Sequence, residues 1–158
     1  MTSSTTDFLA TGRRVIAREA EALGILRAAL DDAFNRALAL IMAAEGRVIV
    51  SGMGKSGHIA RKIAATFAST GTPAHFVHPA EASHGDLGML TKGDVALLLS
   101  NSGETPELAD IITHTRRFGI PLIGVASKPG SSLVRQCDVA ILLPEAPEAC
   151  ETGIVPTT

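Results

Sequence analysis

The chain of 158 residues is 46% hydrophobic and 19% charged, a balance typical of one soluble α/β domain with a single core. Its formal net charge is −2, and its aromatic residues are five Phe with no Tyr or Trp. A basic surface for a nucleic-acid backbone and aromatic platforms for stacked bases are both lacking, so we expect no nucleic-acid partner.

The apolar runs of the chain are short. The longest, residues 37–44, has eight residues, whereas a membrane-spanning helix needs roughly 18–20. We therefore expect no membrane span, and the N-terminal sequence also lacks the sustained apolar region of a secretory signal. Cys137 and Cys150 form no CxxC pair. Together these features predict a reduced, cytoplasmic protein.

Apolar residues recur at three- and four-residue steps from residue 7 to residue 44, which predicts two helices broken near Gly24. After Gly46, short aliphatic runs alternate with helical patterns. The predicted strands are residues 47–52, 74–78, 94–100, 121–127 and 138–144. Helices are predicted at residues 56–70, 105–119 and 131–136, and an irregular stretch at 81–90. This alternation predicts an α/β/α sandwich around a five-stranded parallel sheet.

The first strand is followed by SGMGKSGH, residues 51–58, which satisfies the G-x-G-x-x-G pattern of dinucleotide-binding turns. That interpretation asks for an acidic residue at the end of the second strand, and the nearest carboxylate is Glu81, beyond Pro79. A P-loop would need a glycine where Ile49 stands. Both nucleotide interpretations are therefore weakened, and a tight strand-to-helix connection remains an alternative.

The third strand is followed by SNSGETPE, residues 100–107, which is rich in hydroxyls. Thr105 precedes Pro106 and is the natural N-cap of the next helix. Two loops rich in glycine and hydroxyl groups at neighbouring helix N-termini can bind a phosphate through backbone N–H groups. The sequence therefore predicts a phosphate pocket without arginine, with simple helix capping as the alternative.

Two further loops carry candidate polar groups. His75 and His78 are an odd number of residues apart on a predicted strand and so face opposite sides, which argues against a metal pair. A pair of His78 with His84 remains possible. Because both stand beside a candidate phosphate loop, we expect them to contact a ligand, with an ordinary hydrogen-bonding role as the alternative. The last loop, residues 144–158, is acidic, and one of its glutamates could act as a general base.

The segments SGMGKSGHIARKIAATFASTGTPAHFVHPAEASHGDLGML and SNSGET resemble the sugar isomerase (SIS) domain of the D-arabinose 5-phosphate isomerase family. The similarity runs from about residue 45 to the end, and HGDLGM separates this branch from hexosamine synthases and sugar-responsive regulators. The resemblance implies an SIS-type sandwich that interconverts D-ribulose 5-phosphate and D-arabinose 5-phosphate through an enediol. In the family this takes place in the cytoplasm of Gram-negative bacteria and feeds 3-deoxy-D-manno-octulosonate (Kdo) for lipopolysaccharide.

Matching motifs carry the family's functional residues onto this chain. The catalytic residues implied are Lys55, Glu107 and Glu148. The substrate-binding residues implied are Ser51, Ser56, Gly71, Thr72, His78, His84, Ser100, Asn101, Ser102 and Thr105. Lys55 would stabilise the developing oxyanion, and either glutamate could be the base. No cofactor is required, although the residue matching His78 can bind inhibitory zinc in relatives.

The resemblance also sets expectations for domains and partners. We expect one SIS domain over residues 1–158, with N-terminal helices at 1–44 and a core at 45–158. Family members continue into a long helix, a further catalytic histidine and usually a pair of CBS domains, so we expect a truncated domain with weakened activity. A homo-oligomer, dimer or tetramer, is expected. The alternatives are a non-catalytic regulatory SIS module and a Rossmann-type oxidoreductase.

Overall fold

Five short aliphatic runs form one parallel sheet in the computed structural model, which describes residues 7–150. The elements, in chain order, are α1 (Phe8–Ala29), α2 (Asp32–Met42), β1 (Val48–Gly52), α3 (Gly54–Ser69), β2 (Ala74–Phe76), α4 (Pro79–Ser83), η1 (Asp86–Met89), β3 (Val95–Leu99), η2 (Pro106–Leu108), α5 (Ala109–Phe118), β4 (Leu122–Ala126), α6 (Ser132–Gln136) and β5 (Val139–Leu142). They belong to two units. Asp31–Leu143 holds the whole sheet, whereas α1 and residues 144–150 belong to the other unit.

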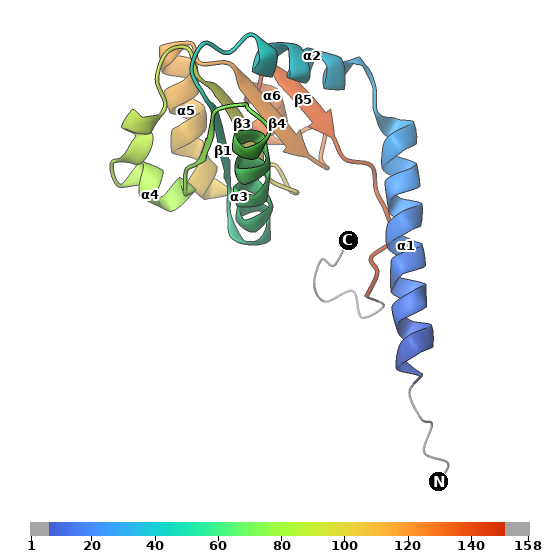
Figure 1. Cartoon of the computed structure of the whole chain (residues 1–158). Helices are drawn as coiled ribbons and strands as arrows, with labels where there is room; N and C mark the ends of the chain where they lie inside the picture. Colours follow the sequence, from blue (N-terminus) through green and yellow to red (C-terminus); the bar gives the residue numbers. More distant parts are fainter. Residues whose placement is uncertain (1–6, 151–158) are drawn as a thin grey trace. The chain divides into compact units, whose positions relative to one another are not determined.

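The strand order across the sheet is β2-β1-β3-β4-β5, with every neighbouring pair parallel (Figure 1). Five parallel strands confirm the predicted sheet. The second strand ends at Phe76, two residues before its predicted end. The reason is local: His78 stands before Pro79 and becomes the N-cap of α4, because proline fits the first turn of a helix but cannot donate to a strand.

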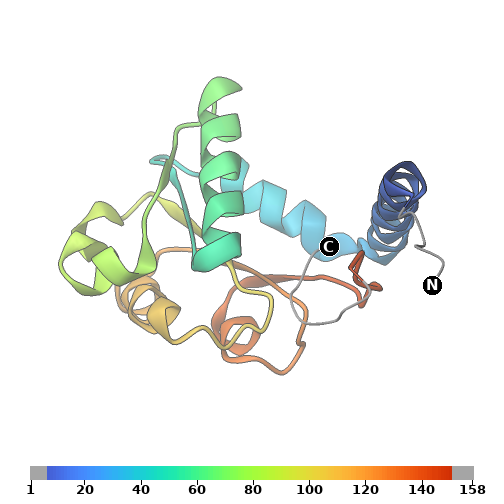
Figure 2. The same cartoon turned by 90° about the horizontal axis from the view of Figure 1, so that it is seen from below.

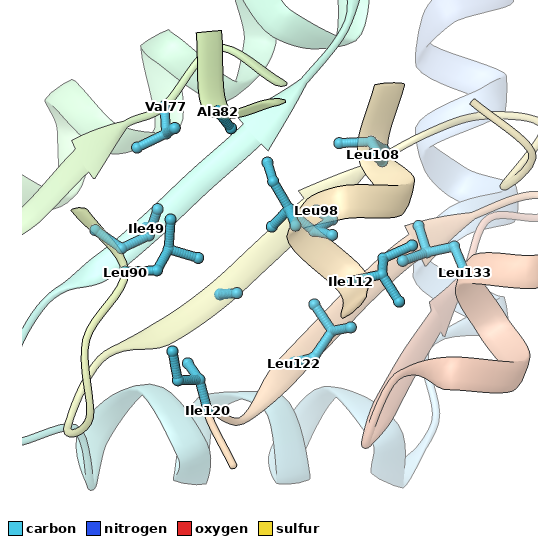
Figure 3. Packing of buried hydrophobic residues seen from close by; sticks show 12 residues of the cluster. Ile49, Val77, Ala82, Leu90, Leu98, Leu108, Ile112, Ile120, Leu122 and Leu133 are labelled. Atoms are coloured by element: carbon cyan, nitrogen blue, oxygen red, sulfur yellow. The ribbon is translucent and has the colours of Figure 1, made fainter. Parts of the chain in front are cut away.

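Side chains alternate between the two faces of the sheet, and both faces are covered by helices (Figure 2). Val48 and Val50 lie on one face, in a cluster with alanines of α2 and α3. Ile49 and Leu98 lie on the other face, in a cluster with residues of α4, α5 and α6 (Figure 3). The three-layer α/β/α sandwich is therefore confirmed. Burial on both faces explains why the strands lack polar alternation.

The predicted helix break near Gly24 is wrong. Helix α1 runs without interruption through Gly24 and ends at Ala29. A single glycine costs a helix only about 1 kcal/mol relative to alanine, which a 22-residue helix tolerates. The break comes instead at Leu30, which is extended, and at Asp31, whose carboxylate accepts a 2.8 Å hydrogen bond from the amide of Ala33 and caps α2.

Two other predicted segments differ in detail. The stretch predicted as irregular, residues 81–90, contains the end of α4 and the 3-10 turn η1. The helix predicted at 105–119 begins as the 3-10 turn η2 and continues as α5. It ends at Gly119, which adopts the left-handed conformation that favours glycine (φ 63°).

Candidate functional site

The sheet reverses its order between β1 and β3. From β1 the chain moves outward to β2 and then crosses back to β3 on the other side. In an open parallel sheet this reversal leaves a crevice beyond the carboxyl ends of the two strands, where ligands bind. The segments that leave these strands are the β1 turn, residues 53–56, and the β3 loop, residues 100–105. Both polar motifs found in the sequence therefore follow neighbouring strands at the same edge of the sheet.

The β1 turn lies close to the sheet because the first turn of its helix has a glycine at position 57. A Cβ atom on Gly57 would lie 2.5 Å from the carbonyl oxygen of Gly52, so only glycine lets the first turn of α3 approach the strand this closely. The N-cap, Met53, makes no side-chain capping bond. Lys55 and Ser56 lie in this first turn, Lys55 exposed and Ser56 half-buried. The N-terminus of a 16-residue helix thus presents its amides beside a lysine.

The hydroxyl groups of the β3 loop form hydrogen bonds within the loop itself. The hydroxyls of Ser100 and Thr105 lie 2.7 Å apart, and the amide of Gly103 donates to the Ser100 hydroxyl at 3.0 Å. The Ser102 hydroxyl accepts from the amide of Glu104 at 3.2 Å. Thr105 takes the predicted N-cap position but makes no side-chain capping bond. Its hydroxyl instead pairs with that of Ser100, so side-chain capping does not explain the presence of Thr105 here.

The end of β2 is clamped to β1 immediately before His78. The buried hydroxyl of Ser51 donates a 2.7 Å hydrogen bond to the carbonyl oxygen of Val77, and the Val77 amide donates to Val50 at 3.0 Å. The His78 ring meets the Phe76 ring edge to face at 6.2 Å. The Nδ1 atom of His78 is buried without a hydrogen-bond partner within residues 7–150. Since buried polar atoms nearly always have one, this atom is well suited to contact a ligand.

Within the unit that holds the sheet, the structure does not bring every predicted residue to the carboxyl edge of the strands. Gly71 and Thr72 form the turn that leads into β2, at the amino edge of the sheet and opposite the β1 turn. His84 ends α4 and is exposed. Glu107 is half-buried in η2, directly after the β3 loop. Glu148 lies in the unit that contains α1, where Arg18 donates to its carbonyl oxygen at 3.2 Å.

A family model for the SIS domain matches residues 41–158. The chain belongs to the SIS domain family. Arabinose 5-phosphate isomerase KdsD of Pseudomonas aeruginosa is 48% identical over 156 residues, 99% of this chain and 48% of that protein. KdsD of Escherichia coli K12 is 48% identical over 96% of this chain and 46% of its own length. The chain thus spans about half the length of these curated relatives.

A solved structure gives the same fold. An Escherichia coli CFT073 protein, solved in complex with arabinose 5-phosphate, superposes with a TM-score of 0.90 at 40% identity, covering 98% of this chain and 82% of that one. The resemblance of the sequence to an SIS domain and the predicted SIS-type sandwich are both confirmed. No helix within residues 7–150 is both long enough and apolar enough to cross a membrane.

Sequence reasoning missed the segment that follows β4 in this SIS domain. Ser131 is only 2% exposed, and its hydroxyl has no hydrogen-bond partner among the residues described. Ser127 and Ser132 both bond to the β3 loop. The sequence signal was present as a Ser-Lys-Pro-Gly-Ser-Ser tract, residues 127–132, at the same edge of the sheet. The tract carries no charge pattern or motif of its own that would mark it as functional.

Proposed function

We propose that this SIS domain is the sugar-phosphate-binding part of an arabinose 5-phosphate isomerase, which interconverts D-ribulose 5-phosphate and D-arabinose 5-phosphate. The observation that carries the proposal is that the β1 turn and the β3 loop follow neighbouring parallel strands at the point where the sheet reverses. Backbone amides and hydroxyls there suit a phosphate, since helix N-termini favour anions. The names of the relatives at 48% identity support the same substrate class.

The phosphate would bind to the β3 loop and to the first turn of α3. Ser100, Ser102 and Thr105 supply hydroxyls, and Ser56 lies in the opposing turn. Asn101 stands between the serines of the same loop. An arginine is unnecessary, because hydroxyls and backbone N–H groups can between them satisfy the phosphate oxygens. The sugar would then extend toward His78, whose buried Nδ1 atom has no partner among the residues described.

Isomerisation requires a base and a group that stabilises negative charge on oxygen. A carboxylate would remove the C2 proton of the aldose, giving an enediol, and a proton returned to C1 would give the ketose. Lys55 would stabilise the oxyanion that develops in between. Glu107 and Glu148 are both candidates for the base. The reaction transfers protons within one substrate and needs no redox cofactor.

Several features of the whole protein belong to the same proposal. They are a role in Kdo and lipopolysaccharide synthesis, a cytoplasmic location, a homo-oligomer, and a CBS pair in the rest of the protein. Zinc could inhibit by binding His78. Residues 7–150 contain no cluster of three or more His, Cys, Asp or Glu side chains placed to hold a metal. A zinc ion at His78 would therefore take its other ligands from water, substrate or other parts of the protein.

The test is isomerisation of D-ribulose 5-phosphate by this chain, with products followed by NMR, for wild type and for Lys55→Ala. Loss of an oxyanion-stabilising group lowers turnover by about 100-fold or more. The matched control is Lys92→Ala, an exposed lysine before β3 at the amino edge of the sheet. If wild type turns the substrate over, an equal rate for Lys55→Ala would refute the assigned role. Saturable binding of D-arabinose 5-phosphate without turnover would leave two alternatives, a truncated enzyme and a regulatory module. Adding the further part found in the longer relatives distinguishes them, because only a truncated enzyme would then gain turnover.

A further inference from the structure

The β3 loop rests on the segment after β4, residues 127–133, which we call the platform. The amide of Ser127 donates to the carbonyl oxygen of Asn101 at 2.9 Å, and the hydroxyl of Ser127 bonds to the Asn101 side chain. Further along, the amide of Leu133 donates to the carbonyl oxygen of Gly103 at 3.0 Å. The loop is therefore joined to its neighbour along most of its length, and the platform governs its shape.

Contact between the loop and the platform is closest at Gly103. This residue has a φ of 65°, and a Cβ atom there would overlap the side chain of Ser131. The buried Ser131 hydroxyl thus lies directly against the backbone of the loop. A glycine with this conformation bends the chain so that the hydroxyls on either side of it, Ser102 and Thr105, belong to one tight turn.

Glu104 is the charged residue of the β3 loop, whose other members are neutral. Its carboxylate accepts a 2.8 Å hydrogen bond from the amide of Ser132. Hydrogen bonds from the Ser132 side chain and amide hold the pKa of the Glu104 carboxyl below its usual value, and the charges of Arg135 and Lys128 act in the same direction. The Glu104 carboxylate is thus bonded to the platform. Its negative charge is unexpected in a loop that is suited to bind an anion, so its presence there calls for another role.

We propose that Glu104 is a positioning residue for the sugar phosphate: its carboxylate, bonded to the amide of Ser132, holds the β3 loop in the shape that binds phosphate. The inference rests on the proposed function and deepens it. Glu104 acts on the phosphate through Ser100, Ser102 and Thr105, the hydroxyl residues of the same loop. It is neither the base nor a ligand of the substrate.

The direction in which the Kd changes when Glu104 is replaced distinguishes a positioning role from simple charge repulsion. A carboxylate close to a phosphate repels it, so removing the Glu104 charge would by itself strengthen phosphate binding. If Glu104 instead positions the loop, Glu104→Ala weakens binding, since the loop loses its attachment to Ser132. We expect about a tenfold rise in the Kd for D-arabinose 5-phosphate, comparable with the loss of one charge-assisted hydrogen bond.

The experiment measures the Kd for D-arabinose 5-phosphate by calorimetry, and the thermal midpoint, for wild type and three variants. Glu104→Ala removes the acceptor, whereas Glu104→Gln keeps a carbonyl oxygen that can accept from Ser132. Glu45→Ala is the matched control, an exposed glutamate before β1 at the amino edge of the sheet. Glu104→Ala should bind about tenfold more weakly with at most a small fall in its midpoint, since Glu104 is exposed. Glu104→Gln should recover most of the affinity, and Glu45→Ala should match wild type.

Each other outcome has a definite meaning. Equal or tighter binding by Glu104→Ala overturns the inference while leaving the proposed function in place. Weaker binding accompanied by a lower midpoint, without recovery in Glu104→Gln, also overturns it, because the residue would then act on the stability of the fold. If wild type itself does not bind D-arabinose 5-phosphate, the proposed function fails and the inference fails with it.

Discussion

The hydroxyl of Ser51 donates a 2.7 Å hydrogen bond to the carbonyl oxygen of Val77, and both residues are buried. This bond joins β1 to the backbone that immediately precedes His78. Ser51→Ala leaves the carbonyl oxygen of Val77 without that donor, and an unsatisfied buried group costs about 1–3 kcal/mol. We expect the free energy of unfolding in urea to fall by that amount.

The control for this prediction is Ser69→Ala. The Ser69 hydroxyl donates to Ala65 at 2.8 Å, but it is exposed at the end of α3, where water can replace it. Its loss should change the free energy of unfolding by less than about 0.5 kcal/mol. Equal effects of the two substitutions would mean that the Ser51 bond adds nothing to the stability of the strand pair.

Gly57→Ala should destabilise the fold by about 1–3 kcal/mol, since overpacking forces the backbone to shift. The new Cβ atom would lie 2.5 Å from the carbonyl oxygen of Gly52, a rigid part of β1. Gly24→Ala should do the opposite and stabilise α1 by about 0.5–1 kcal/mol, because nothing lies within 4 Å of its Cβ position. Urea denaturation of the two variants checks both signs, and a neutral Gly57→Ala would contradict the tight approach of helix to strand.

The ion pair of Arg116 with Asp138 predicts a dependence of stability on pH. Partial burial of Asp138 works against its ionisation, but hydrogen bonds from the Arg116 guanidinium and the Leu122 amide outweigh this and lower the pKa of Asp138. Since the carboxyl has the lower pKa in the folded state, its contribution is present above about pH 4 and is lost as the pH falls through the folded-state pKa.

The size of that contribution is limited by solvent. The two side chains are 40% and 42% exposed, so screening leaves at most about 1 kcal/mol. Asp138→Asn should therefore show a smaller fall in the free energy of unfolding than wild type between about pH 7 and about pH 3. High salt should narrow the gap between the two proteins. An identical fall in both would show that the pair is not coupled to folding.

Leu98 is fully buried in β3, in the cluster that also contains Leu108 and Leu122 (Figure 3). Leu98→Ala should lower the free energy of unfolding by about 2–5 kcal/mol, through lost burial and the cavity left behind. Leu142→Ala, at a position 41% exposed in β5, should cost less than about 1 kcal/mol. A difference of less than about 1 kcal/mol between the two variants would contradict the packing of this core.

The strands and the polar loops could be predicted from the sequence, because each depends on residues that are close together in the chain. Aliphatic runs such as residues 95–99 marked the strands, and the glycines and hydroxyls after β1 and β3 marked the polar loops, because strand burial and turn geometry are local in origin. The same reasoning failed at Gly24, where a local weakness in a helix was smaller than the tendency of the helix to continue. The local sequence does not show whether the cost of one glycine exceeds the stability of the rest of the helix.

Which loops become neighbours follows from the order of the strands in the sheet, and local sequence does not contain that order. The order β2-β1-β3-β4-β5 places the β1 turn beside the β3 loop, and the β3 loop on Ser127, Ser131 and Ser132. It also left Gly71 and Thr72 at the opposite edge of the sheet. These relations follow from strand pairing between residues far apart in the chain, which depends on how two buried faces are packed. The spacing of residues along one strand or helix does not predict that packing.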